Sequence, residues 1–529
     1  MSEKNESFTD HVDIVNLEAA GDAIGRREYE ETTWQAITRR PKTVFWGIYA
    51  LWVLTASSYD SQAGGSFLSV PQFRKDFGFY YDGEYVIPAS WQSAYTGGSY
   101  ASATVGSLGA SYLADRIGRR LVYLIAFAFM YVGITFEVVA TTNSMFFGGK
   151  FINGFAVGAF GTVTMTYLAE ISPKSLRGVT TAAAGLSYTL GPFIVSLILN
   201  AYGEMENRWA YRGIFVSQYA VTTLGLMGLP FMPESPWWLI GQGRDKKAAN
   251  ALRRLGHPAS STDAQIASIK ATLEKVRQET EGVTFLECFK KSNLRRTIIS
   301  IAPLSIQAFV GILFIINYLT YYIQLAGIST ATSFKMQVGA TVICMAANMT
   351  SWFLVDRVGR RNLTMVGVTT MIVILMIAGG LGSQPGNMSY VKGVIALLMI
   401  YDFVYNITIG ATAYNLLAEV STSRLRAKTA SIGLAVQNAF YTMFSFVMPY
   451  LFNPDEANLG AKTTFVYGGL SVLCLIYLYF YQPETSGRTY EELDEMFIDR
   501  VPARKFRNHV TNVERRMQRL AEQSDKQET

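Results

Sequence analysis

Long apolar runs dominate this chain and restrict what it can fold into. Six runs of roughly 20 apolar residues precede position 233, and six more follow position 295. A helix of that length crosses the ~30 Å hydrocarbon core of a bilayer and satisfies its own backbone hydrogen bonds there. Only 16% of the 529 residues are charged, whereas soluble domains carry about 25%. The pattern predicts an all-α membrane protein with 12 transmembrane helices.

Basic residues at the ends of these runs predict the orientation of the helices. The short loops on one side carry clusters of Arg and Lys, namely Arg39, Arg40 and Lys42; Arg116, Arg119 and Arg120; Lys174 and Arg177; Arg357, Arg360 and Arg361; and Arg424, Arg426 and Lys428. The positive-inside rule places this side, with both termini, in the cytoplasm. The net charge of +6 therefore reflects membrane topology, and we expect no nucleic-acid partner.

The same runs divide the chain into five parts. The predicted parts are a cytoplasmic N-terminal segment (1–43), a six-helix half (44–232), a cytoplasmic linker (233–296), a second six-helix half (297–482) and a cytoplasmic tail (483–529). The predicted membrane helices are 44–67, 93–113, 120–140, 146–168, 178–201, 211–232, 297–323, 335–355, 363–382, 393–418, 430–451 and 463–482. We expect linker helices from Asp245 to Leu255 and from Thr262 to Glu279, and a solvated, partly disordered tail beyond Arg500.

Three motifs recur in the same order in the two halves. The sequence from Asp115 to Arg120 returns as Asp356 to Arg361, Glu170 with Arg177 returns as Glu419 with Arg426, and Pro233-Glu234-Ser235 returns as Pro483-Glu484-Thr485. Each recurs about 250 residues further along the chain. Two duplicated six-helix halves are how secondary transporters build a central cavity for alternating access.

The repeated motifs place acidic and basic side chains together in cytoplasmic loops. Interhelical ion pairs among them would hold an inner gate shut in the outward-facing state; the simpler alternative is that the basic residues only anchor the topology. The predicted cytoplasmic gate network is Asp115, Arg116, Arg119, Arg120, Glu170, Arg177, Glu234, Asp356, Arg357, Arg360, Arg361, Glu419, Arg426 and Glu484.

Several longer stretches carry a family resemblance. Met165 to Pro173 with Arg177-Gly178, Pro233 to Leu239 and Pro483 to Thr489 resemble the signatures of the sugar porters. Glu419 to Thr429 and Pro449 to Gly460 are most similar to fungal α-glucoside (maltose) permeases. The resemblance covers about 44–497 and implies the major facilitator fold: two six-helix halves around a central cavity, with cytoplasmic helices between them.

Two carboxylates within predicted membrane helices are candidates for function, because a charge in that position is expensive. Asp60 lies in the first helix, and the resemblance implies a proton carrier there, with a cation from helix four. That cation is an arginine in the family and Lys150 here, which lacks the bidentate fork. The alternative is a static ion pair. Asp402, in the tenth helix, either lines the cavity or sits near its outer mouth.

The expected substrate cavity departs from the family pattern. Gln307 is retained, but the neighbouring glutamine is Ala308, the asparagine after Gly311 is Leu313, and the helix-five glutamine is Pro192. The remaining candidates for substrate binding are Gln62, Gln307, Asn317, Tyr318, Tyr414, Asn415, Gln437, Asn438 and Tyr441. This cavity is poorer in amides than a hexose site, which weakens the assignment to a sugar but not to a transporter.

Three functions remain open from the sequence. The leading one is proton-coupled import of a sugar, an α-glucoside or another di- or oligosaccharide. The second is transport or export of a non-sugar metabolite, such as a secondary-metabolite cluster product, and the third is a nutrient sensor. No catalytic motif is present, and Cys288, Cys344 and Cys474 are too scattered for a metal site or disulfide framework.

The remaining expectations concern cofactors, partners and location. We expect no cofactor, with the proton as coupling ion, and a small-molecule substrate and the lipid bilayer as partners. We expect a monomer in the plasma membrane, with one possible glycosylation site at Asn387.

Overall fold

The computed structural model describes residues 33–280, 284–384, 387–422, 424–488 and 490–512. The chain divides into two compact units. Unit 1 comprises Met1–Phe77 and Ala94–Glu281, and unit 2 comprises Gly78–Ser93 and Gly282–Thr529. The first six-helix half and most of the linker lie in unit 1, and the second half lies in unit 2.

Unit 1 is built from helices. They are α2 (Thr33–Arg39), α3 (Pro41–Ser66), α4 (Pro71–Phe77), α5 (Ala89–Ile117, from Ala94), α6 (Arg119–Val139), α7 (Asn143–Ile171), α8 (Arg177–Tyr202), α9 (Trp209–Gly228), α10 (Pro236–Gly241), α11 (Asp245–Arg254) and α12 (Thr262–Thr280). Short 3₁₀ turns follow α3, precede α8, follow α9 and precede α12, at Phe67–Ser69, Lys174–Leu176, Leu229–Phe231 and Ala259–Ser261. Helix α3 packs against both α7 and α8, and α6 packs against α7.

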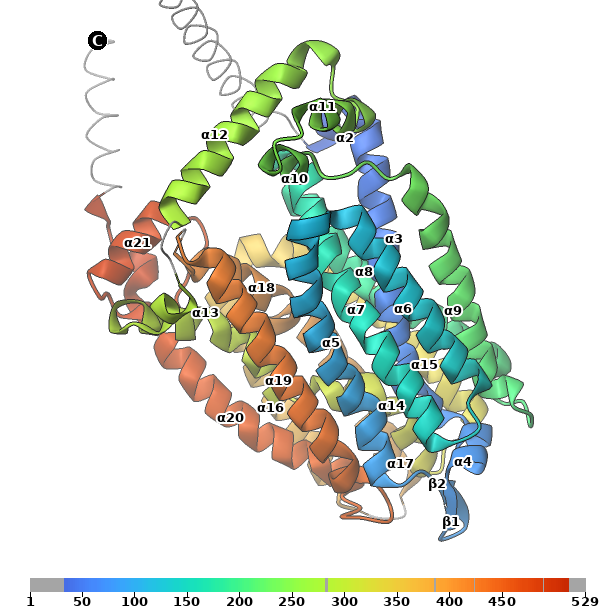
Figure 1. The fold of residues 1–529 in the computed structure, drawn as a ribbon. Coiled ribbons are helices and arrows are strands. Elements are labelled where there is room, and N and C mark those ends of the chain that lie inside the picture. The colour runs from blue at the N-terminus through green and yellow to red at the C-terminus, as the bar shows by residue number, and fades with distance from the viewer. Residues whose placement is uncertain (1–32, 281–283, 385–386, 423, 489, 513–529) are drawn as a thin grey trace, which may run out of the picture. The chain divides into compact units, whose positions relative to one another are not determined.

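Unit 2 contains the second six-helix half and one small sheet. Its elements are β1 (Phe79–Tyr81), β2 (Glu84–Val86), η5 (Phe285–Phe289), α13 (Lys291–Phe309), α14 (Ile312–Leu325), α15 (Thr330–Val358), α16 (Arg360–Gly382), α17 (Met388–Ile407), α18 (Ile409–Val420), α19 (Arg426–Phe452), η6 (Gly460–Lys462), α20 (Thr463–Tyr481), α21 (Tyr490–Ile498) and η7 (Ala503–Asn508). Helices α19 and α20 both run along α13 (Figure 1).

The two strands form a hairpin that the apolar pattern did not predict. Tyr80 pairs with Tyr85, and the two residues between the strands, Asp82 and Gly83, both have positive φ (44° and 92°). An Asp-Gly pair with positive φ suits the right-handed twist of a tight hairpin. The Asp-Gly pair was therefore a turn signal in the sequence. The four aromatic residues of the two strands, which are exposed in the structure, made this segment look apolar and hid the hairpin pattern.

Nine helical stretches of the described residues are long and apolar enough to cross a membrane. They correspond to predicted helices three to ten and twelve. Helices α3, α5 and α19, with 26, 29 and 27 residues, occupy the other three predicted positions. These three helices are more polar in composition than the nine stretches above, so their membrane crossing stays a prediction.

Two predicted single helices are broken. The predicted helix 297–323 divides into α13 and α14 at Val310 and Gly311, where Gly311 adopts φ +91°. The predicted helix 393–418 divides into α17 and α18 at Thr408. The Tyr401 hydroxyl on α17 donates to the carbonyl of Val310 (2.5 Å). Because α13 ends here, this carbonyl has no backbone hydrogen-bond donor within the helix. The apolar composition of a segment indicates that it can lie in lipid, but it does not reveal where the helix is interrupted.

The linker helices begin at the residues predicted, Asp245 and Thr262. The Thr43 hydroxyl at the start of α3 donates to the carbonyl of Leu255 after α11 (2.7 Å) and joins the linker to the first long helix of unit 1.

The tail prediction was wrong in part. Residues 503–508 form η7, where Phe506 is buried against Leu493 and Met496 of α21. Residues 513–529 lie outside the described part of the chain.

Candidate functional site

A buried charge cluster lies among the membrane helices of unit 1. Lys150 Nζ on α7 contacts Asp60 Oδ1 on α3 (3.1 Å) and Glu137 Oε1 on α6 (3.2 Å). The side chains of Lys150 and Asp60 are 1% exposed, and that of Glu137 is fully buried. The predicted partners Asp60 and Lys150 are therefore in contact, and a second carboxylate shares the same ammonium.

Two amides complete the cluster. Asn153 Nδ2 donates to both Asp60 Oδ1 and Glu137 Oε1, at 2.9 Å each. Gln218 Nε2 on α9 donates to Asp60 Oδ1 (3.1 Å). Glu137 Oε2 has no hydrogen-bond partner among the described residues. Helices α7 and α9 thus both bind Asp60 on α3, while the second carboxylate, on α6, keeps one oxygen without a donor among the described residues.

Glu137, Asn153 and Gln218 were missed by the sequence analysis. Glu137 had a clear signal, because it is a single carboxylate inside the predicted span 120–140. Asn153 also had a weak signal, since it follows Lys150 by three residues and shares its helix face. Gln218 had none, because a glutamine in a membrane helix has no preferred direction until the helix is packed.

The predicted gate residues of unit 1 form ion pairs within that unit. Arg119 binds Glu170 through two nitrogens, Nε to Oε2 (3.1 Å) and Nη2 to Oε1 (2.7 Å). Arg119 Nη2 also contacts the exposed Asp115 (3.4 Å). Glu234 accepts hydrogen bonds from the backbone N–H groups of Arg119 (3.0 Å) and Arg120 (3.2 Å) at the start of α6. A carboxylate in that position stabilises a helix N-terminus.

Unit 2 repeats the central contacts of this arrangement. Arg360 Nη2 contacts Glu419 Oε1 (3.0 Å). Glu484 accepts hydrogen bonds from the backbone N–H groups of Arg360 (2.9 Å) and Arg361 (3.2 Å). Gly359 precedes α16 with φ +91°, as Gly118 precedes α6 with φ +93°. The sequence repeat is thus also a repeat of contacts.

The other predicted members of the network take different places. Arg120 Nη2 donates to the carbonyl of Pro230 (2.9 Å), and Arg361 Nη2 to that of Tyr479 (2.8 Å). Arg116 lies over the ring of Tyr112 (4.4 Å), Arg357 is exposed, and Arg426 opens α19. The side chains of Arg177 and Asp356 lie outside the described part of the structure.

Part of the predicted substrate set forms a polar cluster in unit 2. Gln307 Oε1 on α13 accepts hydrogen bonds from Gln437 Nε2 (2.7 Å) and the Tyr441 hydroxyl (3.3 Å), both on α19. Gln307 Nε2 donates to the carbonyl of Ile409, the first residue of α18 (3.1 Å). Tyr414 on α18 lies within hydrogen-bonding reach of Gln437. Gln307 thus connects this cluster to the first residue of α18, next to the break at Thr408.

The remaining substrate candidates lie apart from that cluster. Asn317 and Tyr318 are buried on α14, and Asn415 and Asn438 are half-buried on α18 and α19. No hydrogen bond among the described residues joins Asn317, Asn415 or Asn438 to Gln307. Gln62 lies in unit 1, where its Nε2 donates to the Ser66 hydroxyl (3.0 Å).

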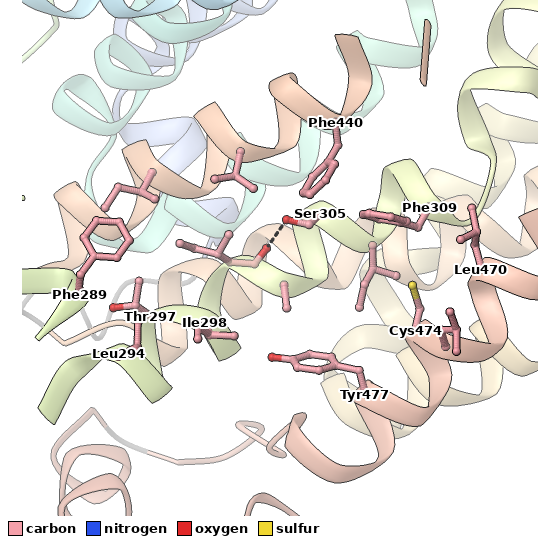
Figure 2. Close-up of a pocket in the computed structure, with 16 residues that line it drawn as sticks. Phe289, Leu294, Thr297, Ile298, Ser305, Phe309, Phe440, Leu470, Cys474 and Tyr477 are labelled. Carbon is pink, nitrogen blue, oxygen red and sulfur yellow. Dashed lines mark hydrogen bonds between the residues drawn. The ribbon is translucent and has the colours of Figure 1, made fainter. Parts of the chain in front are cut away.

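An apolar pocket of about 510 Å³ lies beside this cluster, between α13, α19 and α20. Figure 2 shows Ile298, Phe309 and Phe440 in its walls, with Cys474 and Tyr477 on α20. The hydroxyls of Thr297 and Ser305 in the wall donate to backbone carbonyls of unit 2. A sugar needs polar partners for each hydroxyl that it buries, so this pocket is a poor sugar site.

Asn387 is exposed and caps α17, because its Oδ1 accepts from the backbone N–H of Ser389 (2.9 Å). Its glycosylation stays a prediction. Within the described residues, no group of three His, Cys, Asp or Glu side chains is placed to hold a metal ion.

Comparisons with known proteins identify similar chains. Residues 47–497 match the family described as "Sugar (and other) transporter". The general alpha-glucoside permease of Saccharomyces cerevisiae is 29% identical over 519 residues, which cover 96% of this chain and 84% of the permease. The maltose permease MAL61 of the same species is 30% identical with the same coverage. The MFS transporter fmqE of Aspergillus fumigatus is 31% identical over 518 residues, covering 95% of this chain and 96% of fmqE.

Solved structures show the same fold. The xylose transporter XylE from E. coli, in a partially occluded inward open conformation, aligns with a TM-score of 0.70 and 19% identity over 85% of this chain and 100% of XylE. A structure of the proton:xylose symporter XylE bound to 6-bromo-6-deoxy-D-glucose aligns with a TM-score of 0.68 and 20% identity over 87% of this chain and 100% of XylE. These similarities confirm the predicted helical transporter fold.

Proposed function

Because this chain belongs to the sugar porter family of the major facilitator superfamily, we propose that it imports a sugar together with protons by alternating access. The proposed substrate is an α-glucoside or another di- or oligosaccharide. Relatives named as maltose and general alpha-glucoside permeases, about 30% identical over nearly the whole chain, support this class. The chain is an integral multi-pass membrane protein; its placement in the plasma membrane as a monomer, with cytoplasmic termini and no cofactor besides the proton, is part of the proposal.

The charge balance of the buried cluster in unit 1 is the observation that carries proton coupling. Asp60 and Glu137 are two carboxylates, and among the residues that the structure describes Lys150 is the one cation in contact with them. When all three are ionised the cluster has a net charge of −1, and an unbalanced buried charge is costly. One bound proton makes it neutral. A site that gains by binding a single proton is what a symporter requires.

The contacts indicate what the proton changes. Lys150 and Asn153 tie α7 to both α3 and α6, and Gln218 ties α9 to α3. Protonation of Asp60 removes its charge–charge attraction to Lys150, so the link between α3 and α7 weakens while Glu137 still holds the ammonium. A change in these links alters which packing of the helices is favoured, and substrate binding can bias the same equilibrium.

The substrate side chains of the proposal are the amides and hydroxyls around the broken helices. Gln307, Gln437, Tyr414 and Tyr441 hydrogen-bond among themselves, and Gln307 also donates to the carbonyl of Ile409. A sugar hydroxyl that enters must replace these hydrogen bonds, which favours ligands offering both donors and acceptors. Gln62, Asn317, Tyr318, Asn415 and Asn438 remain candidates for the rest of the site.

Uptake by cells tests the proposal directly. Labelled maltose, sucrose and glucose would be offered to yeast without their own sugar transporters, at external pH of about 5 and about 7.5. We expect maltose uptake that is stronger at acid pH and is lost with a protonophore. Each unit of pH difference supplies about 1.4 kcal/mol per proton, or tenfold accumulation. Asp60→Asn should reduce accumulation to simple equilibration but preserve exchange; full accumulation by this variant would refute the coupling.

A second candidate function is transport of a non-sugar metabolite, in either direction. Two observations favour it: Ala308, Leu313 and Pro192 stand where the family resemblance leads us to expect amides, and the relative fmqE, at 31% identity, has a name that specifies no sugar. If none of the labelled sugars is taken up while the protein is present at the cell surface, this candidate replaces the first.

A further inference from the structure

A second buried carboxylate lies in unit 2, on α17. Asp402 is 8% exposed. Its Oδ2 accepts a hydrogen bond from the thiol of Cys344 on α15 (2.7 Å), and its Oδ1 accepts one from Asn406 Nδ2, one helical turn further along α17 (3.1 Å). Within the described part of the chain Asp402 forms no ion pair. Unlike Asp60, this carboxylate therefore has only neutral partners.

The helices packed around Asp402 bring few titratable groups. Helix α15 contributes the Cys344 thiol, and its charged residues, Lys335, Asp356 and Arg357, lie nine or more residues from Cys344 along the helix. Helix α17 itself contributes the phenols of Tyr401 and Tyr405, and α14 those of Tyr318, Tyr321 and Tyr322. The basic residues of α16 are its first two, Arg360 and Arg361, and α18 has only Tyr414 and, near its end, Glu419. On α17 the nearest lysine, Lys392, is ten residues away, or about 15 Å along the helix.

Two opposing effects act on this carboxyl group. Burial without a cation favours the neutral acid, while two hydrogen-bond donors favour the carboxylate. No charged partner of Asp402 in the described structure outweighs either effect, so the carboxyl group can be either protonated or ionised. We propose that Asp402, with Cys344 and Asn406, is a second proton-binding site, which takes up and releases a proton during the transport cycle. This inference rests on the proposed proton coupling.

The position of Asp402 gives its charge a mechanical consequence. The preceding residue, Tyr401, donates to the carbonyl of Val310 at the break between α13 and α14 (2.5 Å). Asn406, which also donates to the backbone carbonyl of Asp402 (2.9 Å), lies two residues before the break at Thr408. Ionisation of Asp402 changes the hydrogen bonding of a segment that touches both breaks. Binding or release of a proton at Asp402 therefore changes the hydrogen bonding next to the breaks in the interrupted helices.

Infrared difference spectroscopy of the purified full chain in lipid tests the assignment without a substrate. Spectra at about pH 5 and about pH 8 are compared for the wild type, Asp402→Asn and Asp60→Asn. We expect a carbonyl band of a protonated acid that disappears at the higher pH in the wild type and in Asp60→Asn, and is missing from Asp402→Asn. The S–H band of Cys344 should shift with the same pH dependence, because its acceptor changes charge. Asp499→Asn, which removes an exposed acid, is the matched control.

Each outcome decides between the inference and its alternative. If the Asp402→Asn spectrum matches the wild type, or the band stays constant between the two pH values, Asp402 does not exchange protons and the inference falls. Asp402→Glu should restore a titrating band, which excludes misfolding as the cause of its loss. If Asp60→Asn keeps full accumulation while the Asp402 band titrates, the proposed coupling through Asp60 has failed, but proton binding at Asp402 has not.

Discussion

Substitution of Lys150 by Met tests the charge balance of the buried cluster most directly. The change removes the cation that the described structure places between the two carboxylates and keeps most of the unbranched side chain, leaving Asp60 and Glu137 without that counter-charge at 1% and 0% exposure. Removing one partner of a buried ion pair costs about 3–5 kcal/mol. We therefore expect a loss of that size near neutral pH, which for a chain of 529 residues corresponds to a drop in melting temperature on the order of 5 °C.

The loss must depend on pH, because the buried carboxylates escape it by binding protons. The folded variant then binds more protons than the unfolded chain, so its stability falls as pH rises, by about 1.4 kcal/mol per pH unit for each extra proton. Melting curves of the detergent-purified protein between about pH 5 and about pH 8 would show a deficit that shrinks toward acid pH.

Two controls make this experiment decisive. Lys270→Met removes the cation of a surface pair with Asp245, where the side chains are 51% and 44% exposed, and should cost at most about 1 kcal/mol. Adding Asp60→Asn to Lys150→Met should recover much of the loss, because one unpaired carboxylate is removed. A deficit equal to that of Lys270→Met, or one that is the same at all pH values, would refute the reasoning.

Three further predictions follow from the same structure. Glu137→Gln leaves Asp60 and Lys150 as a balanced pair, so the dependence of maltose uptake on external pH should weaken while substrate exchange persists; an unaltered pH profile would contradict this. Gly118→Ala should destabilise the start of α6 by about 1–3 kcal/mol, because φ is +93° and an added Cβ would lie 2.7 Å from Glu234 Oε2; Gly109→Ala, in open space on α5, is the control in melting experiments. Burial, together with the charge of Arg40, lowers the pKa of His257 to about 4. The neutral ring is thus favoured by folding, and up to about 3 kcal/mol of stability is lost as pH falls from about 6.5 to 4. Limited proteolysis should therefore cut the α11–α12 region faster at acid pH, and less so in His257→Gln.

Much of this architecture follows from the sequence, because apolarity and charge at helix ends are local properties. Predicted and observed helix ends agree within a few residues for most helices, and the linker helices begin where predicted. The Asp115–Arg120 repeat indicated a repeated set of ion pairs, and Arg119 and Arg360 make corresponding contacts with Glu170 and Glu419. Asp60 stood out for the same local reason, as a charge inside an apolar run.

Other features depend on how each helix is rotated and packed, which local composition does not specify. Lys150 faces Asp60 and Glu137 together only because α3, α6 and α7 meet at one level. At the break at Thr408, α16 approaches so closely that a Cβ on Gly367 would clash with the Thr408 side chain. The sequence shows Asp402 only as an acid within an apolar segment, whereas its hydrogen-bond donor Cys344, 58 residues earlier in the chain, is revealed by the packing of α15 against α17. The sequence predicted which segments are long helices, nine of which are apolar enough to cross a membrane among the described residues. Tertiary packing alone decided which of their polar groups meet, because a hydrogen bond depends on distance and direction.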